Sequence, residues 1–158
     1  MSTREEFLAR YGELFEHSPW IVEQAWLSGP FATADELHAA LMDVVARASP
    51  EQRLALVRAH PELADRVAQA KGLTAASAAE QAAAGLTALS AEEFEKFHQL
   101  NRRYRELFGF PFIICVGRHS KTEILAAMQQ RLGHTRDQEL DEAITQIGAI
   151  VALRLASR

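Results

Sequence analysis

Residues 135–155 read TRDQELDEAITQIGAIVALRL, and this stretch decides the fold class. Its large apolar residues recur every three or four positions, which places their side chains on one stripe of an α-helix. Thr135, with Gln138 three residues later, is the capping-box pattern of a helix start. The stretch therefore predicts an amphipathic helix with an apolar stripe made of Leu140, Ile144, Ile147, Val151 and Leu155.

The same start signal recurs along the chain and alternates with stop signals. Ser or Thr followed three residues later by Glu or Gln can satisfy two unpaired backbone amides reciprocally. The other such pairs are Thr3/Glu6, Thr33/Glu36, Ser49/Gln52, Ser77/Glu80, Ser90/Glu93 and Ser120/Glu123. Stops follow at Gly29-Pro30, His60-Pro61, Gly72, Gly85, Gly109 and Gly133. The sequence predicts an all-α fold, a single compact bundle over residues 1–158 with about eight or nine helices and no significant sheet.

Composition indicates a soluble globular protein and excludes several classes. Of 158 residues, 48% are hydrophobic and 24% charged, and the net charge of −4 disfavours a general nucleic-acid binder. Cys115 is the sole cysteine, which excludes an intrachain disulfide and fits a reducing compartment. The charged first residues lack the apolar centre of a signal peptide, and no apolar run could span a bilayer. A cytoplasmic protein without a membrane partner is expected.

The segment from Phe112 to Val116 is the one ambiguous stretch. Its residue types favour a strand, but no partner strand is evident. We expect a buried extended piece or an irregular short helix. Cys115, within it, should be protonated and inert because an apolar environment disfavours the thiolate.

His60 is the first candidate for chemistry. Pro61 disfavours helical geometry for the preceding residue and lacks a backbone donor, so His60 should lie at a break after a helix. An imidazole on a stiff corner suits proton transfer near neutral pH. The alternative is a helix-end histidine that caps carbonyl groups.

Two further stretches have both a structural and a functional interpretation. In Ser77-Ala78-Ala79-Glu80-Gln81, Ser77 and Glu80 can form an ordinary capping box, or the helix start can receive a carboxylate while Glu80 and Gln81 clamp urea-like N–H groups. In Phe110-Pro111-Phe112-Ile113-Ile114, the apolar residues can pack in the core or form a pocket wall.

Other kinds of site are not supported. The six histidines show no His-x-x-x-His pair, which argues against a zinc site, and no glycine-rich phosphate loop occurs. Arg102, Arg103 and Arg105 are more consistent with a solvated helix face than with a nucleic-acid patch, given the negative net charge.

Taken in order, the motifs resemble those of one family, the 2-oxo-4-hydroxy-4-carboxy-5-ureidoimidazoline (OHCU) decarboxylases. Each motif alone is modest, but the ordered set covers nearly the whole chain. The matching stretches are Ser18-Pro19-Trp20-Ile21, Ala59-His60-Pro61-Glu62-Leu63-Ala64, Ser77-Ala78-Ala79-Glu80-Gln81, Asn101-x-x-Tyr104-x-x-x-Phe108-Gly109-Phe110-Pro111-Phe112-Ile113-Ile114 and Leu153-Arg154-Leu155.

This resemblance implies an all-helical lyase of urate degradation that releases carbon dioxide from the ureidoimidazoline and yields (S)-allantoin. It implies no metal or organic cofactor, a small-molecule substrate as the partner, and a homodimer as the assembly. By motif, His60 is the catalytic acid. The ligand contacts that it implies are Pro61, Ser77, Ala78, Ala79, Glu80, Gln81, Phe110, Pro111, Phe112, Ile113, Ile114 and Arg154. The alternative function is a non-catalytic helical module that binds or senses a ureide.

Overall fold

The computed structural model of this chain describes residues 3–64 and 74–157. Within those ranges it contains eight α-helices, one short 3₁₀-helix and no strand, which confirms the all-α prediction. The helices are α1 (Arg4–Tyr11), α2 (Trp20–Trp26), α3 (Ala34–Arg47), α4 (Pro50–Arg58), α6 (Ala75–Ala83), α7 (Ala91–Phe108), η1 (Val116–Arg118), α8 (Lys121–Arg131) and α9 (Arg136–Ala156). The stop predicted at Gly72 lies outside the described residues.

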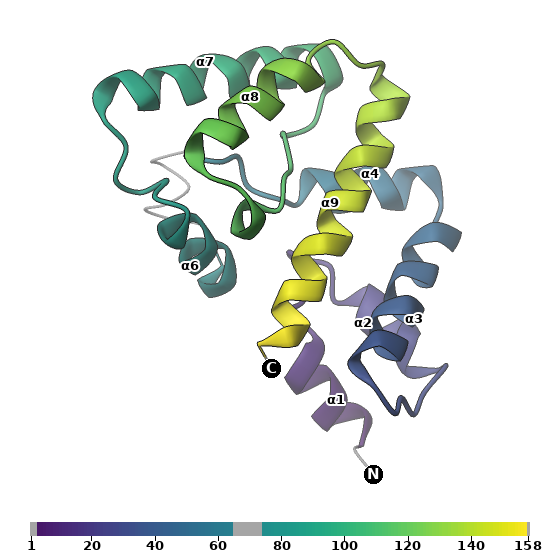
Figure 1. The fold of residues 1–158 in the computed structure, drawn as a ribbon. Helices are drawn as coiled ribbons and strands as arrows, with labels where there is room; N and C mark the ends of the chain where they lie inside the picture. Colours follow the sequence, from purple (N-terminus) through teal and green to yellow (C-terminus); the bar gives the residue numbers. More distant parts are fainter. Residues whose placement is uncertain (1–2, 65–73, 158) are drawn as a thin grey trace.

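Helix α9 is the element around which the others are arranged. It runs diagonally across the molecule in Figure 1, with α2 to α4 on one side and α6 to α8 on the other. It contacts α3, α4, α7 and η1, while α1 packs on α2, α2 on α3, and α8 on α7. No helix of the described residues has the length and apolarity needed to cross a bilayer.

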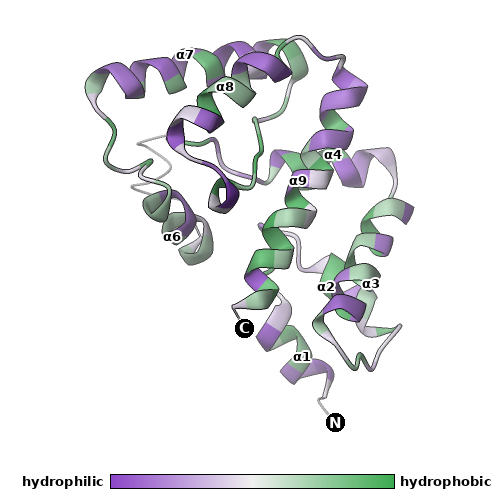
Figure 2. Ribbon diagram, viewed as in Figure 1, coloured by the Kyte–Doolittle hydropathy of each residue, from purple (hydrophilic) through white to green (hydrophobic). Residues whose placement is uncertain are grey.

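The sequence of α9 explains its central place. Its apolar residues gather in the C-terminal half, as Figure 2 shows, and Ile147, Val151 and Leu155 of the predicted stripe are buried. Gly148 allows α3 to approach closely, because a Cβ at this position would lie 3.1 Å from the terminal methyl of Met42. The Nε2 atom of His38, also on α3, lies 2.8 Å from the carbonyl oxygen of Gly148. Burial of such a stripe stabilises a helix more than its intrinsic propensity does.

Most of the predicted capping boxes are present. Both reciprocal hydrogen bonds form at Thr3, Ser49, Ser90, Ser120 and Thr135. Thr33 caps α3 through its side chain, but Glu36 accepts from the amide of Ala32 instead of completing the box.

The capping box predicted at Ser77 and Glu80 is wrong. Helix α6 begins one turn earlier, with Thr74 as the N-cap, and the hydroxyl of Thr74 accepts the amide of Ser77. Ser77 is therefore inside the first turn, and both Ser77 and Glu80 are available for other contacts.

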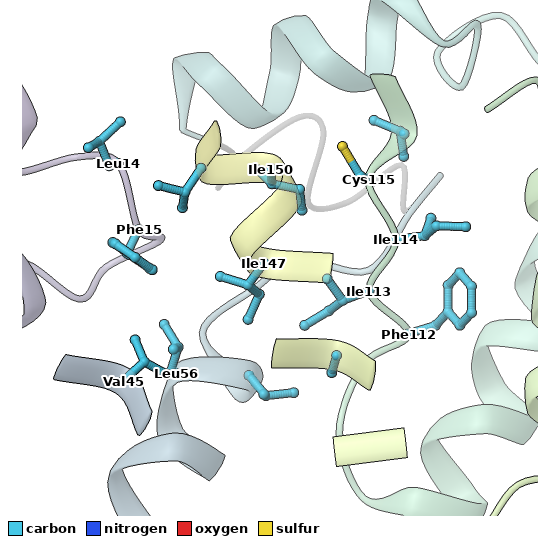
Figure 3. Close-up of a cluster of buried hydrophobic side chains, with 14 of the residues drawn as sticks. Leu14, Phe15, Val45, Leu56, Phe112, Ile113, Ile114, Cys115, Ile147 and Ile150 are labelled. Atoms are coloured by element: carbon cyan, nitrogen blue, oxygen red, sulfur yellow. The ribbon is translucent and has the colours of Figure 1, made fainter. Parts of the chain in front are cut away.

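Between α7 and η1 the chain is extended and buried without being part of a sheet. Gly109 ends α7 with a φ of 80°, a left-handed conformation that glycine adopts without a steric penalty. Residues 110–116 are then all buried. Figure 3 shows their alternation: Ile113 points toward α9, whereas Phe112 and Ile114 point the other way. The buried extended segment is thus confirmed, and burial raises the pKa of the Cys115 thiol, as expected for an inert cysteine.

Candidate functional site

A small cavity of about 30 Å³ lies where the residues after α4, helix α6, helix α9 and the extended segment meet. That volume holds little more than one water molecule. Nine predicted site residues line it, and Leu63, Val116 and Ile150 complete the wall. The nine are His60, Pro61, Ser77, Glu80, Gln81, Phe112, Ile113, Ile114 and Arg154.

His60 follows the end of α4, at the break that its Pro61 neighbour predicted. Its amide donates to the carbonyl oxygen of Val57 at 3.2 Å, and the residue is 7% exposed. Its buried Nε2 atom has no hydrogen-bond partner among the described residues. A buried polar atom without a partner is costly, and such atoms are often found where a ligand or water completes the bonding.

Burial lowers the pKa of His60 to about 4. The negative charge of Glu16 opposes this shift, while the positive charges of Arg154 and His17 add to it. The imidazole is therefore neutral at pH 7 in the unliganded protein, with one nitrogen able to accept a proton.

Arg154 is the charged centre of the site. It projects from the last turn of α9 and its side chain is 4% exposed. Its guanidinium donates to both carboxylate oxygens of Glu80 at 2.8 and 2.9 Å, to Glu16 at 2.9 Å, and to the backbone oxygen of Leu14 at 2.9 Å. Burial would lower the pKa of Arg154, but the hydrogen bonds and charges of Glu80 and Glu16 outweigh burial and raise it. The planar donor set of arginine suits this multiple pairing.

Glu16 is a site residue that the sequence did not reveal. It lies between α1 and α2, is 2% exposed, and accepts hydrogen bonds from Ser77, Thr74 and Arg154. Burial raises its pKa, but these hydrogen bonds and the charge of Arg154 prevail and hold the pKa below its ordinary value. Its only sequence signal is its position two residues before the Ser18-Pro19 motif.

Helix α6 places its polar residues by simple periodicity. Ser77, Glu80 and Gln81 are three and four positions apart and therefore share one face. Ser77 and Gln81 are buried, and the side-chain oxygen of Gln81 accepts the amide of Ala64 at 3.1 Å. The amide group of Asn101 on α7 donates to the carbonyl oxygen of Leu63 at 2.7 Å. The segment after His60 is thus fixed from both α6 and α7.

The remaining predicted ligand contacts do not line this cavity. Ala79 faces a second cavity of about 330 Å³ whose wall shares Glu80, Val116, Ile150 and Arg154 with the first. Phe110 packs against the rings of Tyr104 and Phe108. Ala78 and Pro111 line neither cavity. The described residues contain no cluster of three or more His, Cys, Asp or Glu side chains suited to a metal ion.

The shifted pKa of His60 predicts a pH-dependent stability. Between pH 6.5 and about 4 the unfolded chain binds a proton at this ring that the folded protein does not, so the free energy of unfolding decreases as the pH falls through this window. The contribution, about 3 kcal/mol, is fully present above pH 6.5 and lost near pH 4. Urea unfolding of the wild type and of His60→Gln between pH 7 and pH 4.5 measures it. Protonation of Glu16 also lowers the free energy of unfolding as the pH falls, but it does so in both proteins. The difference between their free energies of unfolding therefore reports on His60. An equal decrease of the free energy of unfolding with pH in both proteins would contradict the lowered pKa of His60.

Comparison with known proteins identifies the family to which this chain is similar. The family model described as OHCU decarboxylase matches residues 1–156. The 2-oxo-4-hydroxy-4-carboxy-5-ureidoimidazoline decarboxylase of Haloferax volcanii is 44% identical over 98% of this chain and 89% of its own length. The protein of the same name from Amia calva is 38% identical over 96% of this chain and 86% of its own.

Solved structures share the fold. The crystal structure of an (S)-allantoin synthase superposes with a TM-score of 0.78 and 31% identity, covering 99% of this chain, which spans 50% of that one. The crystal structure of an OHCU decarboxylase in the presence of (S)-allantoin superposes with a TM-score of 0.73 and 22% identity, covering 99% of this chain and 97% of that one. The expected lyase class agrees with the names of the sequence relatives. This chain belongs to the OHCU decarboxylase family.

Proposed function

We propose that this protein decarboxylates 2-oxo-4-hydroxy-4-carboxy-5-ureidoimidazoline to (S)-allantoin, with His60 as the proton carrier. The observation that carries the proposal is the convergence of a neutral imidazole with Arg154, Glu80 and Gln81 around one cavity, and the Nε2 atom of this imidazole has no hydrogen-bond partner in the part of the chain that the structure describes. Family membership supplies the reaction class. A related structure was determined with (S)-allantoin present, which supports the product.

The substrate supplies most of the chemistry. Its carboxylate and hydroxyl share one ring carbon, next to a ring carbon that carries the ureido group and a C=N bond. When the carbon–carboxylate bond breaks, its electron pair forms a double bond between these two ring carbons, and the C=N electrons move to nitrogen, which takes up a proton. The hydroxyl carbon then becomes a carbonyl, and the ureido-bearing carbon gains the proton that creates the stereocentre. Starting from the ionised carboxylate, one proton is consumed and carbon dioxide is released.

The neutral state of His60 favours one order of its proposed steps. A neutral imidazole cannot donate an imidazolium proton at the outset, so His60 first accepts the proton of the substrate hydroxyl. The imidazolium is then stabilised by the charge of Glu16, which favours the protonated ring. It returns the proton to one face of the ureido-bearing carbon, which selects the hand of the product.

The other polar groups orient the substrate in this proposal. Glu80 accepts N–H groups of the ureido arm, and Gln81, whose side-chain oxygen accepts the amide of Ala64, lines the cavity one residue further along α6. Arg154 orients Glu80 through their ion pair. Its positive charge stabilises the negative charge that develops on the substrate ring. Phe112 to Ile114 form the apolar wall that excludes water.

The site must open to admit this ligand. The cavity of about 30 Å³ is far smaller than a ureidoimidazoline, whereas the neighbouring cavity of about 330 Å³ is of ligand size. The ion pair between Glu80 and Arg154 lines both spaces, together with Val116 and Ile150. We infer that the substrate enters through the larger cavity and displaces part of this ion pair.

Replacing Glu80 with glutamine should weaken substrate binding with little change in stability. The substitution removes a charged acceptor, which is worth roughly 10- to 100-fold in KM. The helix cap is Thr74, not Glu80, and Arg154 keeps its bonds to Glu16 and Leu14, so the melting temperature should hold. Steady-state kinetics and thermal melts of Glu80→Gln, with Glu92→Gln on the exposed face of α7 as the control, test this. A melting temperature that falls while KM stays constant would assign Glu80 a purely structural role.

Chiral analysis of the product tests the function as a whole. The substrate is generated freshly from urate, and optical rotation is followed with and without this protein. Spontaneous decay gives racemic allantoin, whereas the proposed enzyme gives one hand faster. Racemic product at the spontaneous rate, together with measurable binding of (S)-allantoin, would favour the ureide-binding module instead.

A further inference from the structure

A second buried polar cluster lies outside the cavity. Glu139 in the first turn of α9 is 0% exposed and accepts hydrogen bonds from the hydroxyl of Tyr104 at 2.6 Å and from Nε of Arg131 at 2.7 Å. The ring nitrogen Nδ1 of His134 lies 2.8 Å from its other carboxylate oxygen. Burial raises the pKa of Tyr104, so its hydroxyl stays protonated and donates. Three helices, α7, α8 and α9, meet through this cluster.

Arg131 connects the cluster to the pocket wall. Its Nη1 atom donates to the carbonyl oxygen of Ile113 at 2.6 Å, and its guanidinium lies 4.3 Å from the centre of the Phe112 ring. Phe112 and Ile113 both line the cavity that contains His60. One arginine, oriented by Glu139, therefore touches two consecutive residues of the wall.

The wall segment depends on such side-chain contacts because it belongs to no helix or sheet. At its far end the amide of Cys115 donates to the side-chain oxygen of Gln146 on α9 at 2.9 Å. Side chains thus hold the backbone at both ends of the stretch that lines the cavity. An arginine that fixes a carbonyl fixes the peptide plane, and with it the directions of the neighbouring side chains.

We propose that Arg131, held by Glu139 and Tyr104, is a positioning residue for the decarboxylase: it sets the place of Phe112 and Ile113 opposite His60 and so determines which face of the intermediate receives the proton. This inference rests on the proposed function. A loosened wall lets the intermediate bind in more than one orientation, and an error of about 1 Å in such a contact can cost a hundredfold in rate. Arg131 itself touches no reacting atom.

The test compares Arg131→Lys with a matched control, Arg136→Lys. Arg136 also donates to a carbonyl, that of Phe108 at 3.1 Å, and lies 5.7 Å from the ring of Phe110, but neither of these residues lines the cavity. Arg131→Lys should lower kcat/KM about a hundredfold, raise KM, and reduce the enantiomeric excess of the allantoin. Arg136→Lys should leave all three unchanged. Enzyme concentrations are adjusted so that the catalysed rate exceeds the spontaneous one.

The readouts separate positioning from stability. KM and enantiomeric excess do not depend on the fraction of molecules that are folded, so a merely structural Arg131 would lower the maximal rate alone. If Arg131→Lys does not fold, Tyr104→Phe gives the milder test, because it removes one hydrogen bond to Glu139 and should shift KM and enantiomeric excess in the same direction. Unchanged values in every folded variant would overturn the inference.

Hydrogen exchange keeps this inference distinct from the proposed reaction. In Arg131→Lys or Tyr104→Phe, peptides covering residues 110–118 should exchange faster, whereas peptides of α3 should not. This outcome depends on the hydrogen bond to Ile113 and not on turnover. A racemic wild-type product with faster exchange would refute the reaction and keep the positioning role, and unchanged exchange would refute the positioning role.

Discussion

Replacing His60 with alanine should lower turnover by about two to four orders of magnitude, the usual worth of a positioned proton carrier. The helical content should stay unchanged, because His60 lies after the end of α4 and its buried Nε2 bonds to no helix end of the described residues. The allantoin formed by the residual activity should no longer be a single enantiomer, since no fixed group then delivers the proton. Steady-state kinetics, chiral analysis and circular dichroism measure the three effects.

A matched histidine and added imidazole sharpen this test. His98→Ala, on the exposed face of α7, should retain wild-type turnover. Imidazole added to His60→Ala should restore part of the turnover, because the substitution leaves space in the cavity wall. Near-normal turnover of His60→Ala without imidazole would remove this residue from the mechanism.

Replacing Arg154 with methionine should damage both stability and catalysis. The substitution strands Glu16 as a buried carboxylate without its cation, which typically costs about 3–5 kcal/mol and, for a chain of this size, on the order of 10 °C in Tm. Turnover should fall about two to three orders of magnitude, as when a group that stabilises developing charge is removed. Arg102→Met, which breaks an exposed ion pair with Glu106, should change neither property.

A double variant separates the two roles of Arg154. In Arg154→Met with Glu16→Gln the stranded charge is gone, so a part of the lost Tm should return. Turnover should remain low, because the guanidinium that faces the cavity is still absent and the charge of Glu16, which favours the protonated ring of His60, is now absent as well. Recovery of turnover together with Tm would show that Arg154 acts only by neutralising Glu16.

Local patterns predicted the helices because helix starts and stops are local. Thr135 with Gln138, and Gly109 after α7, act through neighbours within four residues, and the structure has both. The same reasoning misplaced the start of α6. Ser77 has the better capping pattern, but its hydroxyl donates to Glu16, 61 positions earlier in the chain. A contact between residues so far apart in the sequence cannot be predicted from a window of a few residues. In the structure Thr74 is the N-cap instead.

The candidate site was predictable where family motifs coincide with the cavity wall. His60, Glu80 and Phe112 lie in such motifs and line the cavity. The sequence analysis did not identify Glu16 because its neighbours form no motif around it. What marks Glu16 in the structure is its bond to Arg154, which lies 138 positions away. Charge alone could not single out one carboxylate among the 21 acidic residues of the chain. Only the packing of α9 against the segment before α2 shows that Glu16 is buried.

The bond from Arg154 to the backbone of Leu14 has a consequence for biosynthesis. These two residues lie 140 positions apart in the chain and meet in one charged pocket. The role proposed for Arg154 then predicts that a nascent polypeptide stays inactive until the final turn of α9 has left the ribosome, however early the preceding helices form. The same role predicts that a premature stop codon before position 154 yields an inactive product even where the preceding helices assemble.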